Sequence, residues 1–346
     1  MSLRFCDSFD HYDTAHMQDK WTQLATNTGI NNTLSRTGPQ CAAMGSGGGL
    51  LNSKTIDYQA GWYIGMAIQL QAYGGSVGVG YTSPGKGQAY ILFNGDGTLG
   101  AYGGSIGGGT FYANSQAGPN TAMLLNRYYY LEVFFGIAVA GTIIIKLNGL
   151  AVLSLTGVQT DFYGSGLADC VALAGPGGGS FMYVDDLYVC DGTGAHNNSF
   201  LGDVRVGCIF PASDGAELNY VPSSGTTHYA MVDEAPPASP IPDDDTTYVY
   251  DSTPNDRDCY TFQQVDVTRT FLGLQIVITG RKDDAGVREI QGFQRTVNGN
   301  YNYGAAVAPN LNYESYIWPS DINPDTGTLW TGAAINSSQF GVLTAA

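Results

Sequence analysis

Apolar residues along the chain occur in short runs that glycine-rich turns separate, with almost no helical period. The runs at 61–70, 88–93 and 129–135 are rich in aromatic and aliphatic residues. Short runs of this kind at steady spacing are typical of strands in an all-β protein. We therefore predict strands over these three ranges.

One hairpin is predicted in detail within residues 141–155, whose sequence is GTIIIKLNGLAVLSL. Two apolar runs flank the pair Asn148 and Gly149. A type I′ turn needs two residues with positive φ, and Asn followed by Gly is a favoured pair for it. The sequence thus predicts a two-residue turn between two antiparallel strands.

A domain boundary is predicted in the Gly- and Asn-rich run 191–199. This run follows a predicted strand at 181–190 and precedes a new alternating segment that begins at Phe200. Residues 1–192 hold 7 basic and 12 acidic residues, a net charge of 7 − 12 = −5. Residues 193–346 hold 7 and 18, a net charge of 7 − 18 = −11. We expect one domain on each side of this change.

The second domain is also expected to be rich in β-structure, with strands at 259–262 and 272–279. Before them lies a proline-rich stretch, residues 235–245, of sequence APPASPIPDDD. Prolines cannot donate to a sheet and favour an extended polyproline II backbone. We expect an extended surface loop, with an arm that reaches a neighbouring subunit as the alternative.

Composition narrows the classes of protein. The 346 residues carry 14 basic and 30 acidic side chains, a formal charge of −16, and only 13% are charged, while 48 are glycine. Scarce charged helix formers argue against a helical bundle or a doubly wound α/β enzyme. With 43% hydrophobic residues the chain is not disordered. The acidic balance argues against nucleic acid as a partner.

The sequence also bears on targeting and on thiol chemistry. Residues 1–7 lack the apolar region of a secretory signal. The apolar stretch 128–155 is interrupted by Glu132, Lys146 and several glycines, so we expect no membrane insertion. The six cysteines are far apart, without C-x-x-C spacing or matching histidines. We expect buried free thiols made in a reducing cytosol, with disulfides left open.

Four segments resemble a known family when they are taken in order. They are 5–12 (FCDSFDHY), 130–133 (YLEV), 146–149 (KLNG) and 183–189 (YVDDLYV). Together they resemble the concanavalin A-like lectin/glucanase jelly rolls of the LamG type, over about residues 1–192. The resemblance implies an N-terminal jelly roll, a β-sandwich of two sheets, within an all-β chain.

The second half is similar to a segment that follows such a jelly roll in structural proteins of tailed bacteriophages. The similarity rests on 200–206 (FLGDVRV), 232–234 (VDE), 243–249 (DDDTTYV), 323–330 (NPDTGTLW) and 339–342 (QFGV). It implies a component of the virion exterior, made in the host cytoplasm, with other capsid or tail proteins as partners. A homo-oligomer is expected from that context.

The acids of the first domain do not match a glucanase. Glycoside cleavage needs two carboxyl groups that flank the bond, and glucanases of this superfamily carry paired glutamates with an aspartate between them on one strand. Residues 1–192 contain a single glutamate, Glu132, whose same-face neighbours are Phe134 and Gly136. The paired-acid motif is absent, and we expect no catalytic residue and no enzyme activity.

Two other groups of acidic residues are candidates for a site. Asp185 and Asp186 are adjacent on a predicted strand, so their side chains should point to opposite faces and not line one cleft. The resemblance makes one of them a loop-bracing acceptor or a calcium ligand at the rim, and we expect the loop-bracing role and no cofactor. Asp243, Asp244 and Asp245 lack EF-hand spacing and are expected to form a solvated turn.

Two other catalytic motifs bear on the question. The glycine–serine segments 45–47 (GSG), 164–166 (GSG) and 178–180 (GGS) do not match the G-x-S-x-G pattern of a nucleophile elbow. The glycine-rich run 103–109 is not followed by G-K-S or G-K-T, so it is not a phosphate loop. Tight turns between strands explain these glycines.

Aromatic side chains and prolines are the remaining candidates for contacts. Tyrosine and tryptophan at loop tips serve both sugar stacking and protein interfaces, although half or more are expected in the core. The segment 298–304 is predicted to be an exposed turn that presents two tyrosines. The candidate contacts with a partner or glycan are Trp62, Tyr63, Tyr301, Tyr303, Pro236, Pro237, Pro240 and Pro242.

These observations favour a non-enzymatic virion structural protein, in capsid decoration or in the tail, that docks on other virion proteins and also binds host-surface glycan. One alternative is a phage-borne polysaccharide depolymerase, a glycoside hydrolase. The other is a free lectin-like adhesin, which the missing secretion signal disfavours.

Overall fold

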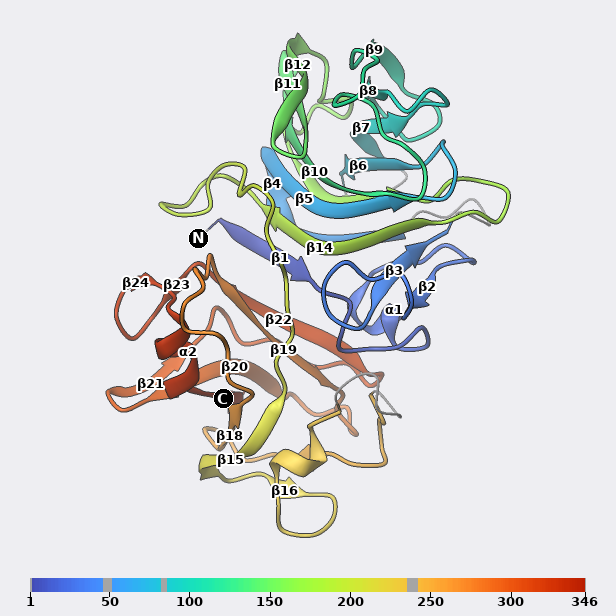
Figure 1. Ribbon diagram of the computed structural model, residues 1–346. Helices are drawn as coiled ribbons and strands as arrows, with labels where there is room; N and C mark the ends of the chain where they lie inside the picture. The colour runs from blue at the N-terminus through green and yellow to red at the C-terminus, as the bar shows by residue number, and fades with distance from the viewer. Residues whose placement is uncertain (1, 46–51, 82–85, 235–241, 346) are drawn as a thin grey trace. The chain divides into compact units, whose positions relative to one another are not determined.

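The computed structural model describes residues 2–45, 52–81, 86–234 and 242–345, and its chain forms two compact units. Unit 1 is Met1–Gly207 and unit 2 is Cys208–Ala346. Both consist mainly of antiparallel strands (Figure 1), so the all-β fold class is confirmed. Within the described ranges, no helix is long and apolar enough to cross a membrane.

The elements of unit 1 are one short helix and fourteen strands among its described residues. They are β1 (Leu3–Asp7), α1 (Met17–Lys20), β2 (Gly29–Asn31), β3 (Cys41–Met44), β4 (Asn52–Gln59), β5 (Gly61–Leu70), β6 (Ser76–Gly80), β7 (Gly87–Phe93), β8 (Leu99–Gly103), β9 (Thr110–Asn114), β10 (Tyr128–Gly136), β11 (Gly141–Leu147), β12 (Leu150–Val158), β13 (Ala168–Ala174) and β14 (Met182–Cys190).

The elements of unit 2 are shorter and more often interrupted by loops. They are β15 (Pro211–Leu218), β16 (Val221–Pro222), the 3₁₀ turn η1 (Tyr229–Met231), β17 (Val249–Tyr250), β18 (Arg257–Phe262), β19 (Leu274–Gly280), β20 (Glu289–Thr296), β21 (Gly299–Asn302), β22 (Glu314–Ser320), β23 (Ile322–Asn323), β24 (Thr328–Leu329), α2 (Gly332–Ser337) and β25 (Gln339–Ala345).

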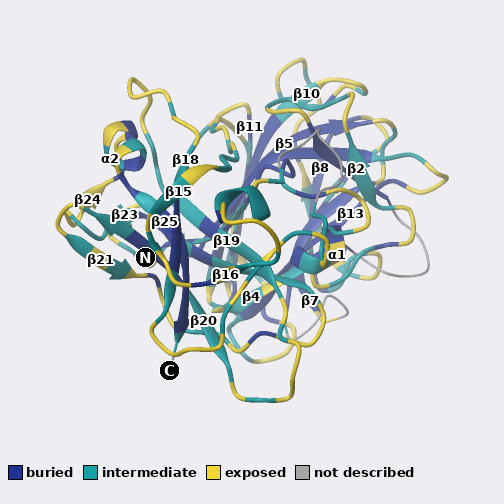
Figure 2. Cartoon of the chain, turned by 90° about the horizontal axis from the view of Figure 1, so that it is seen from below, coloured by how far each residue is buried: buried dark blue, intermediate teal, exposed yellow. Residues whose placement is uncertain are grey.

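Unit 1 is a sandwich of two sheets. The first has the strand order β12-β11-β10-β5-β14-β3-β2, with β1 pairing to β14, and the second has the order β4-β13-β6-β7-β8-β9. Alternate residues of β5 and β10 are fully buried, and their aliphatic and aromatic side chains form the core that the pattern predicted. In Figure 2 the buried strands are dark blue and many of the connecting loops are yellow.

The predicted hairpin is confirmed. β11 pairs with β12 in antiparallel fashion, and the two turn residues have φ values of 49° at Asn148 and 80° at Gly149. Asn148 also braces the neighbouring strand, because its Oδ1 accepts a hydrogen bond of 2.8 Å from the backbone N–H of Tyr130. The turn is therefore tied to β10 as well as to its own strands.

The division between the units lies after Gly207, whereas the sequence placed it after residue 192. The intervening segment belongs to unit 1 because it packs on the first sheet. Leu201 and Val204 contact a buried cluster that contains Tyr130 and Tyr188. The change of charge and the glycine-rich run mark the end of β14, and the chain continues on the surface of the same unit.

Unit 2 is built around a five-stranded antiparallel sheet of order β15-β18-β25-β20-β21, with three two-stranded ladders, β16-β17, β19-β22 and β23-β24. The expected strands at 259–262 and 272–279 correspond to β18 and β19. A core cluster of this unit gathers Ile276, Tyr303, Trp318, Trp330, Ile335 and Phe340.

All six cysteines lie in the described ranges, and none of them forms a disulfide. Cys41, Cys170, Cys190 and Cys259 are buried, whereas Cys6 and Cys208 are partly exposed. Burial raises the pKa of Cys41 and Cys170 to about 12 and that of Cys6 to about 11. These three thiols therefore stay protonated and unreactive at neutral pH.

The β11–β12 turn gives a direct test of the hairpin. Gly149 holds a left-handed conformation, and an added Cβ would meet no atom within 4 Å, so only backbone strain opposes a side chain. We expect Gly149→Ala to lower the free energy of unfolding by about 1 kcal/mol. Urea unfolding followed by tryptophan fluorescence measures the change.

Gly108→Ala is the matched control for this variant. Gly108 is exposed, has no left-handed φ, and is equally free of neighbours. It should change the free energy of unfolding by less than about 0.5 kcal/mol. Equal effects of the two substitutions would contradict the positive-φ requirement at Gly149.

Candidate functional site

The outer face of the first sheet of unit 1 carries an unusual set of polar side chains. Along β10, Leu131 and Val133 face the core, so strand alternation turns Tyr130 and Glu132 to the opposite side. Tyr188 of β14 lies on the same side and reaches Glu132. These outward-facing residues are nevertheless buried, with exposed fractions of 1% for Glu132 and 2% for each tyrosine.

Residues 200–206, which we call the covering segment, bury this face. Glu132 Oε1 accepts hydrogen bonds from the Tyr188 hydroxyl at 2.7 Å and from the backbone N–H of Gly202 at 2.8 Å. The Leu201 N–H in turn donates to the Tyr188 hydroxyl oxygen at 3.1 Å. The phenyl ring of Phe200 lies 4.2 Å from the Lys146 ammonium. A buried carboxylate and the main chain of the covering segment thus satisfy each other.

The Asp185–Asp186 pair departs from the expected alternation. Asp185 Oδ2 accepts from the backbone N–H groups of Arg36 and Thr37, at 2.7 and 2.9 Å, and Asp186 Oδ2 accepts from the Thr37 hydroxyl at 3.0 Å. Both carboxylates therefore reach the same loop, and the prediction that they point to opposite faces is wrong. The cause is a register shift in β14, where Asp186 adopts a positive φ of 52°.

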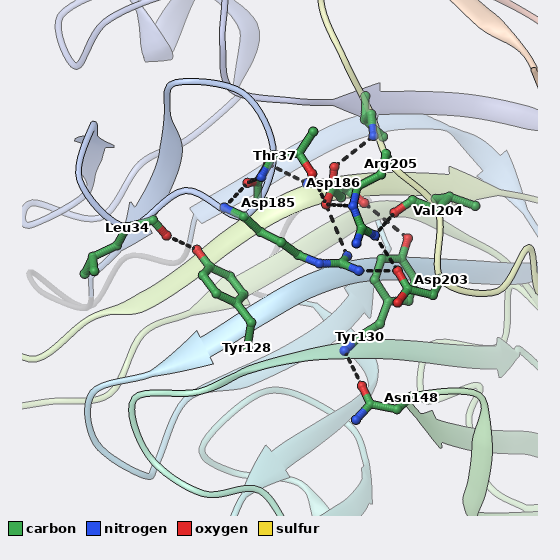
Figure 3. Close-up of polar contacts among 12 residues, drawn as sticks. Leu34, Thr37, Tyr128, Tyr130, Asn148, Asp185, Asp186, Asp203, Val204 and Arg205 are labelled. Carbon is green, nitrogen blue, oxygen red and sulfur yellow. Dashed lines mark hydrogen bonds and ion pairs between the residues drawn. The ribbon is translucent and has the colours of Figure 1, made fainter. Parts of the chain in front are cut away.

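An ion-pair network joins this loop to the covering segment (Figure 3). The Arg36 guanidinium pairs with Asp186 at 3.1 Å and with Asp203, and it lies 5.0 Å from the centre of the Tyr130 ring. Arg205 pairs with Asp203 at 2.6 Å. Two cations thus neutralise the buried and half-exposed acids on this side of the sheet.

The pKa shifts on this outer face, which we call the covered face, follow from its burial. Burial raises the pKa of Asp185 to about 6, and it also raises the pKa of Asp186. Burial, followed by nearby carboxylates, raises the pKa values of Tyr130 and Tyr188 well above their usual range. These tyrosines therefore serve as hydrogen-bond donors and do not supply a phenolate base at neutral pH.

The acids of the covered face and of the 243–245 run have hydrogen-bond donors as neighbours. Asp185 and Asp186 brace the loop at Arg36 and Thr37, which is the role expected for one of them. Among the residues that the structure describes, no group of three or more His, Cys, Asp or Glu side chains could hold a metal ion. In the 243–245 run, Asp245 pairs with the Arg281 guanidinium at 2.8 Å.

The aromatic residues proposed as contacts have varied positions. Trp62 is fully buried and donates from Nε1 to the Ala168 carbonyl at 3.2 Å, a position that excludes contact with a partner. Tyr63 is half-buried, with its ring centre 4.4 Å from that of Phe134. In the folded chain, Trp62 and Tyr63 are therefore held by their own neighbours.

The expected two-tyrosine turn of unit 2 presents at most one of its tyrosines. Tyr303, the residue after β21, is 4% exposed and lies in the core. Tyr301 lies within β21 and is half-buried. The Tyr301 hydroxyl donates to Asp325 at 2.6 Å. Pro242 is half-buried, and Pro236, Pro237 and Pro240 lie outside the described residues.

An open pocket of about 440 Å³ lies where β10 begins and the β11–β12 hairpin turns. Its walls come from the loop before β10, from the first residues of β10 and from the hairpin turn. The lining residues are Pro119, Asn120, Arg127, Tyr129, Leu147, Asn148 and Leu150. The pocket combines an aromatic ring, side-chain amides and one cation.

Arg127 is distinctive among the cations of unit 1. Its side chain is exposed and, within the part of unit 1 that the structure describes, it alone among the lysines and arginines has no ion pair, side-chain hydrogen bond or aromatic contact. Tyr129 is held in place because its hydroxyl oxygen accepts from the Leu124 N–H at 3.0 Å. A preformed wall therefore stands beside an unengaged guanidinium.

Sequence reasoning missed this pocket. The signal that could have found it is Arg127 followed by three tyrosines, opposite the Asn148–Gly149 turn that the sequence did identify. Strand alternation would then have separated Tyr129 from Tyr130. The sequence does not show that the loop at Pro119 and Asn120 lies beside Tyr129 and the hairpin turn.

Comparisons with known proteins give matches to solved structures at low identity and low TM-score. The sequence matches no protein-family model and no curated protein. The cellulose-induced protein Cip1 is 18% identical, with 59% of this chain and 99% of that chain covered and a TM-score of 0.39. An endo-β-1,4-glucuronan lyase from the fungus Trichoderma reesei is 10% identical, with coverages of 55% and 94% and a TM-score of 0.37. A carbohydrate esterase from the Shiga toxin-encoding bacteriophage phi24B is 11% identical, with coverages of 54% and 99% and a TM-score of 0.35.

These comparisons correct two expectations drawn from the sequence, a structural virion protein and the absence of enzyme activity. The structures named here, together with alginate lyases, are mainly carbohydrate-active enzymes. A galectin from Caenorhabditis elegans and congerin II are among the other matches, with identities of 15% and 11% and TM-scores of 0.28 and 0.29. The phage resemblance has one counterpart among them, the esterase. The chemistry of this chain is argued below from its own residues.

Glu132→Ala tests whether the buried carboxylate holds the covering segment. The variant leaves the Tyr188 hydroxyl and the Gly202 N–H without their acceptor, at a cost of about 1–3 kcal/mol each if they stay buried. We expect faster amide hydrogen exchange at Gly202 and a lower urea midpoint. Glu132→Gln, which keeps an acceptor oxygen, should show a smaller change. Unchanged exchange at Gly202 in Glu132→Ala would contradict this role.

Asp10 predicts a pH dependence of stability. Burial raises its pKa to about 7, and the Asp185 charge contributes in the same direction. Asp10 ionises at a lower pH in the unfolded chain than in the folded protein. The stability that Asp10 contributes is therefore fully present below about pH 4 and is lost as the pH rises toward 7. We expect Asp10→Asn to be more stable than the parent by about 1 kcal/mol or more at pH 7.5, with no advantage near pH 4.

Asp203→Asn should behave in the opposite way. Burial acts to raise the pKa of Asp203, but hydrogen bonds from Arg36 and Arg205 outweigh it and lower that pKa. The stability that Asp203 contributes is therefore present above about pH 4 and is lost as the pH falls further. Urea unfolding between about pH 2.5 and pH 7.5 compares the two variants, and parallel pH profiles would rule out this assignment.

Proposed function

We propose that unit 1 binds a polysaccharide in the open pocket between the start of β10 and the β11–β12 turn. The observation that carries the proposal is the combination of Tyr129, the amides of Asn120 and Asn148, and the unengaged Arg127 around one opening. Its volume of about 440 Å³ lies in the range of about 300–1,000 Å³ that small-ligand sites occupy.

The lining chemistry suits a sugar. A pyranose ring has apolar C–H faces and a polar rim, and tyrosine offers an apolar ring together with a polar edge. Exposed amides donate and accept hydrogen bonds, which matches hydroxyl groups that also do both. Leu150, 49% exposed at the rim, adds apolar surface beside them.

The pocket is built to hold its shape. Asn148 is fixed twice to Tyr130, through its side-chain Oδ1 and through its backbone N–H, at 2.8 Å each. Tyr129 is fixed at its hydroxyl by Leu124. A site that is ordered before its ligand arrives loses less conformational entropy on binding.

The covered face is not the first choice for the binding surface. Its Tyr130, Tyr188 and Glu132 side chains are almost inaccessible and already hydrogen-bonded to one another or to the chain. A ligand there would have to displace residues 200–206. The pocket needs no such rearrangement, so it is the surface at which we place the sugar.

We further propose a polysaccharide of a bacterial surface as the physiological ligand. The similarity of segments such as 200–206 and 323–330 to proteins of tailed bacteriophages supports this source. Tailed phages meet bacterial surface glycans at infection.

Tyr129→Ala tests the pocket. The full chain is titrated with a panel of soluble polysaccharides by isothermal titration calorimetry, and the best ligand is compared across variants. Removal of the ring should weaken binding about tenfold or more. Tyr129→Phe, which keeps the ring, should stay within about threefold, corresponding to about 0.7 kcal/mol.

Phe111→Ala is the control outside the pocket. Phe111 is 51% exposed in the same unit, so its removal should leave the affinity unchanged. Thermal unfolding of each variant checks that the unit is folded. The same mixtures are assayed for new reducing ends and for unsaturated sugar products, either of which would add cleavage to binding. No binding by the parent chain, or equal binding by Tyr129→Ala, would refute the proposed site.

A further inference from the structure

We infer that the pocket selects a sugar that carries a carboxylate, a uronic acid residue, and that Arg127 is the residue that recognises its charge. This inference rests on the proposed function and specifies the ligand class of the same site. It is carried by the charge of the pocket lining, by the free state of the guanidinium and by the orientation of Asn148.

The pocket lining differs in charge from the rest of the chain. Acidic side chains outnumber basic ones by 30 to 14 over the whole sequence. The seven lining residues include one cation and no aspartate or glutamate. An anionic ligand therefore meets local attraction in a molecule that otherwise repels it.

The guanidinium of Arg127 is available at no cost in other interactions. The remaining cations of unit 1 are engaged, such as Arg4 with Asp191 and Arg36 with Asp186 and Asp203. Recruiting Arg4 or Arg36 to a ligand would take a partner from a buried acid. Arg127 has no such partner among the described residues, and its planar fork matches the two oxygens of a carboxylate.

The Asn148 amide points its donors toward the open side. Its Oδ1 is occupied by the Tyr130 N–H, and this bond fixes which end of the amide faces the protein. The NH₂ group is left for the exposed side of the residue. A donor amide beside a guanidinium favours a ligand whose groups accept hydrogen bonds, as carboxylate oxygens do.

The experiment uses matched pairs of polysaccharides that differ in the acid group. Polygalacturonate is paired with its fully methyl-esterified form, polymannuronate with mannan, and polyglucuronate with cello-oligosaccharides. Dextran sulfate with dextran forms a fourth pair that carries sulfate in place of carboxylate. Each is titrated into the full chain by calorimetry at low and at moderate NaCl.

In at least one pair the uronate polymer should bind about tenfold or more tightly than its neutral partner, and added NaCl should weaken that binding. Arg127→Gln should abolish the preference. Asn148→Asp, which keeps an acceptor for Tyr130 and replaces the donor with a negative charge, should also reduce uronate binding. Because Arg127 is exposed and unengaged, its replacement should leave the thermal unfolding temperature unchanged.

Arg269→Gln is the control for net charge. Arg269 is exposed in unit 2, and its loss changes the total charge by the same amount as Arg127→Gln. It should leave the uronate preference intact. An equal loss in both variants would overturn the role of Arg127, because the effect would then come from the charge of the whole chain.

The outcomes separate this inference from the proposed function. Binding of neutral polymers as tightly as uronates, with a Tyr129→Ala effect, would overturn the inference and keep the pocket as a glycan site. Stronger binding of the sulfated polymer would overturn the choice of carboxylate. No binding of any polymer would remove both.

Discussion

The structure of unit 1 depends on the hydrogen-bond donors that stabilise three buried carboxylates on one face of its first sheet. Glu132, Asp185 and Asp186 are almost completely buried, and a buried carboxylate without donors would cost several kcal/mol. Each receives donors from chain that is remote in sequence, namely the loop at residues 36–37 or the covering segment at 200–206. This need explains why the unit extends past its last strand, because without residues 193–207 two of these acids would lose main-chain donors.

Periodicity and turn chemistry predicted much of the framework. The ranges 61–70 and 88–93 match strands to within a residue, and Asn148–Gly149 supplied the positive φ values that its turn requires. The failures share a physical cause, since each concerns a contact between segments distant in the sequence. Asp186 takes a left-handed backbone at a bulge and accepts hydrogen bonds from Thr37 and Val206, and Trp62 turns into the sandwich, where its Nε1 donates to the Ala168 carbonyl. Alternation assumes a regular strand and an exposed outer face, and neither holds along β14.

The pocket at the start of β10 likewise depends on contacts between distant segments. The hairpin turn was predictable and Arg127 was visible, but their proximity depends on the register between β10 and β11 and on the loop that precedes β10. Strand β10 serves both sides of the sheet, because Tyr129 lines the pocket whereas Tyr130 packs under Arg36. One strand therefore couples an accessible polar pocket to a covered, densely hydrogen-bonded face, and Asn148 fixes the position of both through Tyr130.

The route of the covering segment has a mechanical consequence. It ends just before Cys208, where unit 2 begins, so a force that pulls on unit 2 reaches the segment through the backbone. The bond from the Val206 N–H to Asp186 would bear that force first, followed by the ion pair of Asp203 with Arg36 and then by the bonds at Gly202 and Leu201. Hydrogen bonds that open one after another resist tension far less than bonds that must break together. The junction would therefore yield by peeling at modest tension and lengthen the chain between the two units, while the sandwich beneath it stays folded.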